Sequence, residues 1–442
     1  MLLPQAEFLK QYLSFQSVSL HEHNQIQETA EFLRDHFESI GAQNVQILTT
    51  KVTNPAVYAE IPAQVSSDVT VLFYNHYDVQ PAEPLALWDT DPFELAEHDG
   101  KLFARGINDD KGELAARLAA IDDLRQAGKL PVNVKFLVEG AEEQGSPHLE
   151  VLLNKYAELL SADFCLWESG GKDEKGQLKF SLGVKGGVAF QLTARNADHD
   201  LHSSLGAITE NPAWHLVQAL ATLKNDAGEI TIPGFYDDII PLTPTQKQIV
   251  ADSTFDYATY AQNAGLTRPA TTDNPAAALV DKPSFTINGL SSGYEGPGTG
   301  KMILPHVAVA KLDFRIVPGQ TVEHTIELVR QALDANGFED IEISGLLGEP
   351  AFRSDPDHPL VQAALNAARQ AYPDGVSVVL NSAGSGPMPY FYAVNHAPII
   401  SVGIGNANSA AHGPNENVTV ADYLQFIAYL KAMLPALATN SQ

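Results

Sequence analysis

The stretch PVNVKFLVEGAEEQG, residues 131–145, decides the fold because it leads from an apolar strand into two adjacent carboxylates, Glu142 and Glu143. Its run VNVKFLV is typical of a strand that a sheet buries on both faces. Neighbouring carboxylates repel, and each raises the pKa of the other, so an isolated pair favours a solvated turn. The alternative is a division of labour in which one carboxylate holds a cation and the other moves protons. The rest of the chain has to decide between these two interpretations.

Helical and strand patterns alternate around this stretch. Apolar residues recur at helical spacing in AEFLKQYLSF and QIQETAEFLRDHFESIG, and strand patterns follow in NVQILTT, AVYAEI and VTVLFYN. The same alternation of helical and strand patterns returns after about residue 348, in PLVQAALNAARQAY and PIISVGIG. This alternation predicts an α/β fold with a mixed, largely parallel sheet and helices on both of its faces.

A different pattern separates these two parts of the chain. Three strand patterns, VKGGVAFQLTA, HVAVAKLDFRI and IEISGL, occur with two helical patterns, NPAWHLVQALATLK and TVEHTIELVRQALDANG. A segment rich in Pro, Asp and Thr, residues 225–285, interrupts them, and its stretch TQKQIVADSTFDYATYAQNAG predicts one helix. We therefore expect a main domain in two parts, 1–183 and 348–442, with a separate α+β domain inserted at 184–347.

The formal charge of -27 on 442 residues excludes several classes of partner. Such a surface repels nucleic acid and anionic membranes, and no apolar run approaches the roughly 20 residues that span a bilayer. We expect no signal peptide, because MLLPQAEFLKQYLSFQ has the pattern of an amphipathic helix. The single cysteine, Cys165, excludes an internal disulfide. We therefore expect a cytoplasmic protein without nucleic-acid or membrane partners.

Side chains that bind metals recur just past the ends of predicted strands. His76 and Asp78 follow VTVLFYN, Glu168 follows DFCLW, and His412 follows PIISVGIG. Asp109 lies in FARGINDDKG, directly before a predicted helix. The carboxyl ends of strands line the binding crevice of an open α/β sheet, so these scattered segments can meet at one point.

Together these side chains predict a metal centre, although each alone is a common turn residue or an ordinary histidine. The candidate ligands are His76, Asp109, Glu143, Glu168 and His412. Two imidazoles and three carboxylates suit a borderline divalent ion, and five ligands exceed the three that a catalytic zinc takes. We therefore expect two divalent ions per chain that share a carboxylate, zinc in the first place and Mn²⁺ or Co²⁺ as alternatives.

The metal centre answers the question that the carboxylate pair raises. In this interpretation Glu143 is a ligand, and Glu142 is the general base that takes a proton from metal-bound water. A nearby dication makes the repulsion between the two carboxylates tolerable. Asp78 would accept the second N–H of the His76 imidazole and so fix its tautomer.

These motifs resemble those of the co-catalytic zinc peptidase and deacylase family. They run in order from about residue 70 to residue 416, as NHYDVQP, DGKLFARGINDDKGE, EGAEEQGSP, LWESG, DLHSSLG, LDFRIVP and HGPNE. The family includes carnosinase, the cytosolic nonspecific dipeptidase, acetylornithine deacetylase, succinyl-diaminopimelate desuccinylase, aminoacylase and glutamate carboxypeptidase, and the first two are the most similar. The resemblance implies a phosphorylase/hydrolase-like catalytic domain with an inserted ferredoxin-like lid and dimerisation domain.

The resemblance also implies how the metal ligands are shared. Asp109 resembles the bridging carboxylate, which family members often follow with a cis peptide bond. His76 and Glu168 would complete one metal site, and Glu143 and His412 the other.

Residues of the lid and of one loop resemble the family's substrate-binding groups. His202, in DLHSS, resembles a histidine that reaches the partner's active site in family dimers, so a homodimer is expected. Arg315, in DFRIVP, resembles the arginine that binds the substrate carboxylate. Gly384 and Ser385, in NSAGSGP, resemble the loop at the same end of the substrate, and Asn288, in TINGL, is a further lid candidate.

One departure from the family pattern leaves the substrate open. The dipeptidases tend to have an acidic residue, which receives a free amino group, three positions before the loop serine, where this chain has Ser382. We expect metal-dependent hydrolysis of the amide bond of a small peptide or acyl-amino acid, with a dipeptidase in the first place. The alternative in the same class is an N-acyl amino acid deacylase. The alternative of another class is a non-catalytic binding protein that retains the fold.

Overall fold

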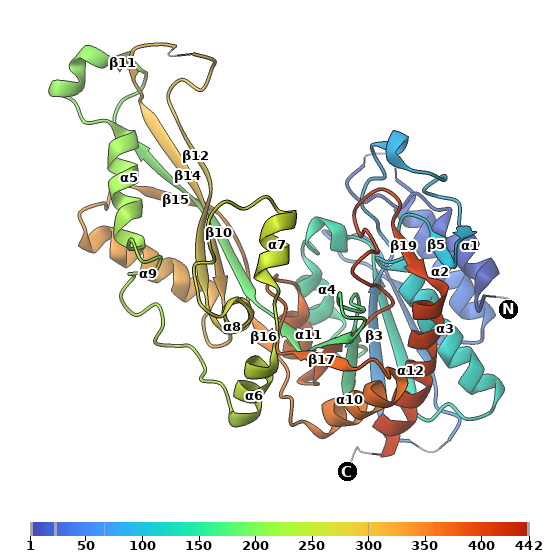
Figure 1. Ribbon diagram of the computed structural model, residues 1–442. Helices are drawn as coiled ribbons and strands as arrows, with labels where there is room; N and C mark the ends of the chain where they lie inside the picture. The colour runs from blue at the N-terminus through green and yellow to red at the C-terminus, as the bar shows by residue number, and fades with distance from the viewer. Residues whose placement is uncertain (1–2, 22–23, 66, 299, 440–442) are drawn as a thin grey trace. The chain divides into compact units, whose positions relative to one another are not determined.

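The computed structural model describes residues 3–21, 24–65, 67–298 and 300–439 (Figure 1). The chain forms two compact units. The first unit comprises the chain up to Gly183, Ser354–Leu380 and the chain from Pro387 onward, and the second unit comprises Val184–Arg353 and Asn381–Gly386. These units differ from the expected domain limits in two short segments, 348–353 and 381–386, which cluster with the second unit.

A mixed sheet of eight strands forms the centre of the first unit, in the order β1-β2-β6-β3-β7-β18-β8-β17. Its strands are β1 (Gln43–Leu48), β2 (Ala56–Ile61), β3 (Thr70–His76), β6 (Asn133–Glu139), β7 (Phe164–Trp167), β8 (Leu178–Ser181), β17 (Val376–Val379) and β18 (Ile399–Ser401). Strand β3 pairs in parallel with both β6 and β7, β18 with β7, and β17 with β8. The remaining pairs, β1 with β2, β2 with β6 and β18 with β8, are antiparallel. The predicted mixed, largely parallel sheet is therefore confirmed.

Helices cover both faces of this sheet, as neighbouring residues of β3 show. The helices of the unit are α1 (Ala6–Leu13), α2 (Ile26–Ser39), α3 (Lys111–Gln126), α4 (Leu149–Lys155), α10 (Pro359–Ala371), α11 (Met388–Asn395) and α12 (Val420–Thr439). Phe73 lies beneath the Arg117 guanidinium of α3, with 5.3 Å between the guanidinium carbon and the ring centroid. Tyr74 contacts Phe391 of α11. Successive side chains of a strand point to opposite faces, so α3 and α11 lie on opposite sides of the sheet.

Shorter elements complete the first unit. They are the 3-10 helices η1 (Leu85–Leu87) and η2 (Glu142–Gln144) and a three-stranded sheet of β4 (Ala96–His98), β5 (Lys101–Phe103) and β19 (Asn417–Thr419). Two short strands, β9 (Gly183–Val184) and β16 (Phe352–Arg353), lie at the limits of the second unit.

The second unit is an antiparallel sheet with two helices on one face. The strands β10 (Gly186–Arg195), β12 (Ser284–Ser292), β14 (Val307–Ile316) and β15 (Glu342–Glu349) follow the order β12-β14-β10-β15. Apolar side chains alternate along β14 because Leu312 and Phe314 face the core while Lys311 faces solvent. They pack against buried residues of α5 (Pro212–Leu223) and α9 (Val322–Ala335), such as Leu220 and Leu333.

The prediction of a single helix in the stretch TQKQIVADSTFDYATYAQNAG is wrong, because the structure has two helices there. Helix α6 (Pro244–Asp252) ends at Ser253, which is extended, and α7 (Tyr257–Asn263) begins after Asp256. The Asp256 side chain accepts the N–H of Thr259 and so starts a new helix instead of continuing the first. The unit also contains β11 (Leu201–His202), η3 (Ser203–Ala207), α8 (Pro275–Asp281) and β13 (Ile303–Leu304). In the described parts of the chain, none of the helices combines the length and apolar character that a bilayer crossing requires.

Candidate metal centre

Three adjacent parallel strands bring the predicted metal ligands to one edge of the sheet of the first unit. Strand β3 ends at His76, β6 is followed by Glu142 and Glu143 in η2, and β7 is followed by Glu168. Since parallel strands end on the same side, these side chains meet without any long-range adjustment of the chain.

Asp109 lies between the two predicted histidine ligands. One carboxylate oxygen, Oδ1, is 2.9 Å from Nε2 of His76, and the other, Oδ2, is 3.1 Å from Nε2 of His412. The Asp109–Asp110 peptide bond is cis, as the resemblance implied. Asp110 begins α3, and its carboxylate accepts the main-chain N–H of His76 at 3.1 Å, which links the Asp109 loop to the end of β3.

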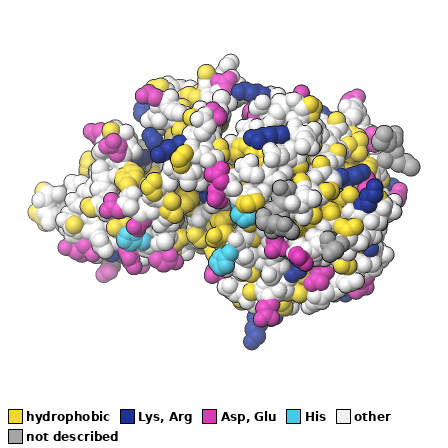
Figure 2. Space-filling model, turned by 90° about the horizontal axis from the view of Figure 1, so that it is seen from below, with side chains coloured by type: hydrophobic (Ala, Val, Ile, Leu, Met, Phe, Trp, Pro, Cys, Tyr) yellow, Lys and Arg dark blue, Asp and Glu magenta, His cyan; other side chains and the backbone are white. Residues whose placement is uncertain are grey.

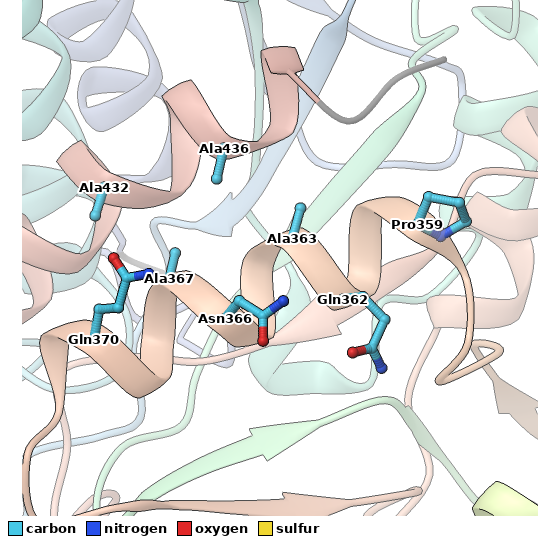
Figure 3. A pocket seen from close by; sticks show the side chains of 8 residues that line it. All are labelled: Pro359, Gln362, Ala363, Asn366, Ala367, Gln370, Ala432 and Ala436. Atoms are coloured by element: carbon cyan, nitrogen blue, oxygen red, sulfur yellow. The ribbon is translucent and has the colours of Figure 1, made fainter.

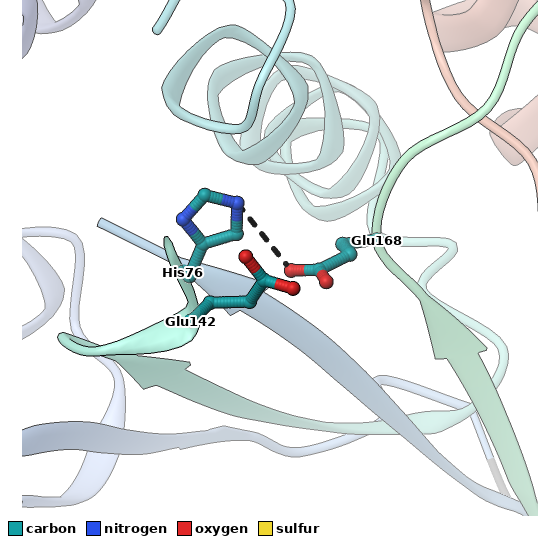
Figure 4. Close-up of side chains that lie close together, drawn as sticks. All are labelled: His76, Glu142 and Glu168. Carbon is teal, nitrogen blue, oxygen red and sulfur yellow. Dashed lines mark ion pairs between the residues drawn. The ribbon is translucent and has the colours of Figure 1, made fainter. Parts of the chain in front are cut away.

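Two groups of potential ligands meet at Asp109, which itself belongs to the second group. The ligand atoms of His76, Glu142 and Glu168 lie within 4.8 Å of one another, and so do those of Asp109, Glu143 and His412. In the first group the carboxylates point toward each other and toward the imidazole ring (Figure 4), with 3.6 Å between His76 Nε2 and Glu168 Oε2. In the second, 3.2 Å separate His412 Nε2 and Glu143 Oε2.

The donor set fits divalent cations. Glu168 Oε2 is buried and has no hydrogen-bond donor among the residues that the structure describes. A buried carboxylate oxygen without a partner is costly unless a cation takes that place. Burial also raises the pKa of Glu142 to about 8 and that of Glu168 well above its usual range, and neighbouring carboxylates add to both shifts while His76 opposes them. Imidazole nitrogen with carboxylate oxygen is the mixture that Zn²⁺, Mn²⁺ and Co²⁺ accept.

The hydrogen bonds of the Asp78 carboxylate differ from the one expected from the sequence. The His76 Nδ1 atom lies 2.9 Å from the main-chain oxygen of Asp78 and 3.4 Å from its carboxylate. The carboxylate instead accepts the N–H groups of Glu142 and Glu143, each at 3.1 Å, and the Ser19 hydroxyl at 2.7 Å. Asp78 therefore fixes the position of the two glutamates as well as that of the histidine.

A buried ion pair that the sequence analysis missed holds the Asp109 loop. Glu416 accepts the main-chain N–H groups of Gly106, Asn108 and Asp109 at 2.8–3.0 Å. Arg105 donates to the same carboxylate at 2.5 Å. The glutamate of the HGPNE motif was the available signal in the sequence.

A second buried cation joins the ends of two strands that carry ligands. Arg117 of α3 donates to the main-chain oxygens of Tyr74 in β3 and of Leu166 and Trp167 in β7, at 2.6–3.2 Å. It also pairs with Glu113 one turn earlier. Because this guanidinium bonds to both strands, it sets the spacing from which His76 and Glu168 project.

The expected substrate-binding residues all belong to the second unit, where the structure brings three of them together. Arg315 of β14 donates from Nη1 to Ser385 Oγ at 3.1 Å and from Nε to Asp313 at 3.0 Å. The main-chain oxygen of Gly384 accepts the N–H of Lys185 at 3.0 Å, which anchors the same loop.

The two other lid candidates lie apart from this cluster. His202 is exposed at the start of η3, where its Nδ1 accepts the main-chain N–H of Ser204 at 3.2 Å. Asn288 lies on the edge strand β12, at a register shift between Ile287 and Gly289. Both side chains are exposed, so packing in the core of the second unit does not account for either residue.

A groove elsewhere on the first unit offers no chemistry of its own. It has a volume of about 350 Å³ and lies between α10 and α12 (Figure 3). Alanine, proline and amide side chains such as Ala363, Gln370 and Ala432 line it, and none of the lining side chains titrates. The metal centre, whose side chains can bind cations and move protons, is therefore the functional candidate.

Charged side chains are distributed unevenly by sign on one face of the molecule. On the face drawn in Figure 2, acidic side chains are scattered over the surface, while Lys and Arg side chains form small, separate groups. Nucleic-acid binding uses a continuous basic patch, which this face does not present.

Comparisons with known proteins point to one family. The model of Peptidase family M20/M25/M40 matches residues 72–436. The crystal structure of an M20 family metallo-carboxypeptidase, Sso-CP2 from Sulfolobus solfataricus, has a TM-score of 0.88 at 35% identity and covers 98% of this chain and 99% of that chain. The Beta-Ala-His dipeptidase of Mus musculus is 30% identical over 80% of this chain and 74% of its own length. The Cys-Gly metallodipeptidase dug1 of Schizosaccharomyces pombe is 28% identical over 94% of this chain and 91% of its own length.

Proposed function

This chain belongs to peptidase family M20/M25/M40, and we propose that within the family it acts as a dipeptidase with Glu142 as the general base. It is a metal-dependent peptidase that hydrolyses small peptides. The single observation that carries the proposal is the placement of Asp109, whose two oxygens face two separate groups of ligands. One carboxylate that serves two such groups is the arrangement of a two-metal hydrolase.

The ligand roles follow from the two groups. His76 and Glu168 would hold one ion, Glu143 and His412 the other, and Asp109 would bridge them. Bound divalent ions supply an activated water at neutral pH and polarise the substrate carbonyl. We propose zinc as the native metal, with Mn²⁺ or Co²⁺ as alternatives, because the ligands mix imidazole and carboxylate.

The chain's own residues then move the proton and orient the substrate. Glu142 lies beside the first ligand group and is held by the Asp78 carboxylate through its main-chain N–H. From there it takes a proton from the attacking water and delivers it to the nitrogen of the leaving amine. Arg315, with Ser385 and Gly384 beside it, binds the carboxylate of the substrate, and Asn288 is a further candidate for substrate contact.

The test of Glu142 separates chemistry from metal binding. Glu142→Gln is expected to retain two metal ions per chain but to lose at least about 100-fold in kcat, since a positioned general base contributes at least that much. Glu150→Gln, on the exposed surface of α4, is the matched control and should behave as the wild type. Near-normal turnover of Glu142→Gln on alanyl dipeptides would refute the assignment of the base.

A second candidate function rests on Ser382. The loop 381–386 contains no acidic residue, and the Ser382 hydroxyl donates to the main-chain oxygen of Gly384 at 3.1 Å. This loop therefore has no carboxylate that could receive the free amino group of a substrate, in contrast to what the resemblance to the dipeptidases implies. This favours substrates whose amino end is blocked or extended, which a deacylase or a carboxypeptidase would cleave, and the 35% identical structure is that of a carboxypeptidase.

Paired substrates distinguish the two candidates. We expect alanyl dipeptides, their N-acetylated forms and a blocked tripeptide to be cleaved at different rates, with chelator abolishing every activity. Faster cleavage of the free dipeptides supports the dipeptidase, and cleavage of only the blocked substrates supports the second candidate. Ser382→Glu should then raise the ratio of free to blocked substrate cleavage, because it restores the carboxylate.

We also propose a homodimer in which His202 acts in the partner's site, and a cytoplasmic location. The proposal is supported by the match of DLHSS to the family and by the exposed position of the ring. Mixing inactive His202→Ala protein with inactive Glu142→Gln protein should recover activity, because a mixed dimer contains one complete site. No recovery after subunit exchange, or a monomer in sedimentation, would refute it.

A further inference from the structure

Three residues of the second unit form a row across its sheet, beside the loop that carries Ser385. Gly187 of β10 is paired with Arg315 of β14 on one side and with Glu349 of β15 on the other. A Cβ atom on Gly187 would come to 3.3 Å from Ser385 Oγ and 3.5 Å from Arg315 Nη1. The glycine therefore leaves the space in which the Ser385 hydroxyl sits between a cation and an anion.

The hydrogen bonds of Ser385 have a fixed direction. Arg315 donates from Nη1 to the hydroxyl oxygen at 3.1 Å. A guanidinium can only donate, so the oxygen is the acceptor, and the single hydroxyl proton is directed elsewhere. Glu349 lies across Gly187 from Arg315, on the same face of the sheet, because directly paired residues of neighbouring strands point the same way. Glu349 is thus part of the same cluster as the two residues that are proposed to hold the substrate carboxylate.

We propose that Glu349 selects the C-terminal residue of the substrate, favouring a cationic side chain there and rejecting an acidic one. This inference rests on the proposed function, in which Arg315 binds the carboxylate of that residue. The Ser382 position bears on how the amino end of the substrate is bound. Glu349, in contrast, acts on the carboxyl-terminal residue.

The spacing of the charges supports this selection. Adjacent strands lie about 4.8 Å apart, so the main chains of Arg315 and Glu349 are separated by roughly 10 Å across Gly187. A C-terminal lysine or arginine carries its carboxylate and its cation on one residue, with a long flexible stem between them. It can therefore pair its carboxylate with Arg315 while its side chain approaches Glu349. A glutamate side chain at this position would face a second carboxylate.

Several other charged side chains around the loop already have hydrogen-bond partners. Lys185 donates to the main-chain oxygens of Ala278 and Lys282, and Arg353 donates to the side-chain oxygen of Asn381. Asp313 is bonded to Nε of Arg315. Glu349 is half-buried, and burial raises the pKa of its carboxyl while the neighbouring Ser385 and Arg315 lower it. A half-buried charge is less screened by salt than an exposed one, so it can discriminate between substrates.

The test compares three peptides that differ in one charge at a time. Alanyl-lysine, alanyl-glutamine and alanyl-glutamate are assayed with the wild type and with Glu349→Gln at about pH 8, because burial raises the pKa of the Glu349 carboxyl above its ordinary value. We expect the wild-type kcat/KM to fall from lysine through glutamine to glutamate. In Glu349→Gln the lysine-to-glutamate ratio should fall by about tenfold or more, since a change of one unit charge near a partly buried group is worth about that factor.

Controls make each outcome decisive. Glu342→Gln, at the other end of β15 and exposed, should keep the wild-type ratio. A ratio within about twofold of wild type in Glu349→Gln, or a wild-type preference for glutamate, refutes the inference. If Glu349→Gln does not fold, the wild-type ratio is measured in low and high salt, where a constant ratio refutes the role of the charge and a falling ratio supports it.

The proposed function and this inference fail in different ways. If none of the dipeptides is cleaved but Nα-acetyl-lysine and Nα-acetyl-glutamate are, the dipeptidase proposal fails. The lysine-to-glutamate ratio is then read from the acetylated pair, and the same shift in Glu349→Gln supports or refutes the selection by Glu349.

Discussion

Replacing Glu416 with Gln tests whether the buried ion pair positions the bridging carboxylate. The variant keeps the side-chain shape, and its amide oxygen can still accept the N–H groups of Asn108 and Asp109. Its NH₂ group then points at Arg105 and at the N–H of Gly106, both of which are donors. The guanidinium is left buried without its carboxylate.

The expected loss follows from these contacts. Removing one partner of a buried ion pair costs about 3–5 kcal/mol. In a unit of this size each kcal/mol lowers the Tm by about 2 °C, so the Tm of the first unit should fall by about 6–10 °C. The Asp109 loop should also loosen, and metal affinity should fall by about 10–100-fold, as it does when residues that orient metal ligands are changed.

Calorimetry and competition with a metal-binding dye measure the two effects. Glu97→Gln, on the exposed strand β4, is the matched control and should leave both unchanged. A Tm within about 2 °C of wild type would show that the ion pair contributes little. A lower Tm with normal metal affinity would refute the reasoning that joins Glu416 to Asp109. Combining Glu416→Gln with Arg105→Leu should cost less than the sum of the single changes, because the uncompensated guanidinium is then absent.

Two further predictions concern stability. Removing metal with a chelator should lower the Tm of the first unit and leave that of the second unchanged. Both ligand groups lie in the first unit, and a bound ion stabilises only the state that holds it. Equal shifts in two calorimetric transitions would contradict this. Burial lowers the pKa of His36 to about 4, and its ring is tilted against that of Phe8 with 4.1 Å between the ring centroids. The unfolded chain therefore binds more protons between about pH 6.5 and 4, and stability should fall with falling pH in that window. His36→Phe should reduce this loss by about 1–3 kcal/mol in denaturant titrations at both pH values, and an unchanged slope would contradict the assignment.

The metal ligands could be predicted from sequence because their positions depend on local pattern. Each follows an apolar strand or precedes a helix, and parallel strands carry their ends to one edge, as with His76 and Glu168. The residues that hold the ligands could not be found in this way. Arg105 and Glu416 are 311 positions apart, and no local pattern in either segment indicates the other. The same is true of Ser19, which reaches Asp78 across 59 positions.

Errors and omissions outside the metal centre have similar causes. The break between α6 and α7 depends on the single capping residue Asp256, which competes with helix continuation and leaves the apolar periodicity almost unchanged. Glu349 was missed because strand register, rather than sequence spacing, places it beside Arg315. Register is set by tertiary pairing, which one sequence does not display.

The strand order of the first unit has a consequence for how the protein is made. Strand β7 has its outer neighbour in β18, which a ribosome synthesises roughly 230 residues later. At about 5–20 residues per second, the edge of β7 waits for some 10–50 seconds while the inserted unit is produced. An unpaired apolar strand edge is a site of aggregation, so the nascent chain is expected to need chaperone protection until β18, in about the last tenth of the chain, emerges. Fragments that end with the inserted unit should be insoluble, although they contain four of the five proposed metal ligands.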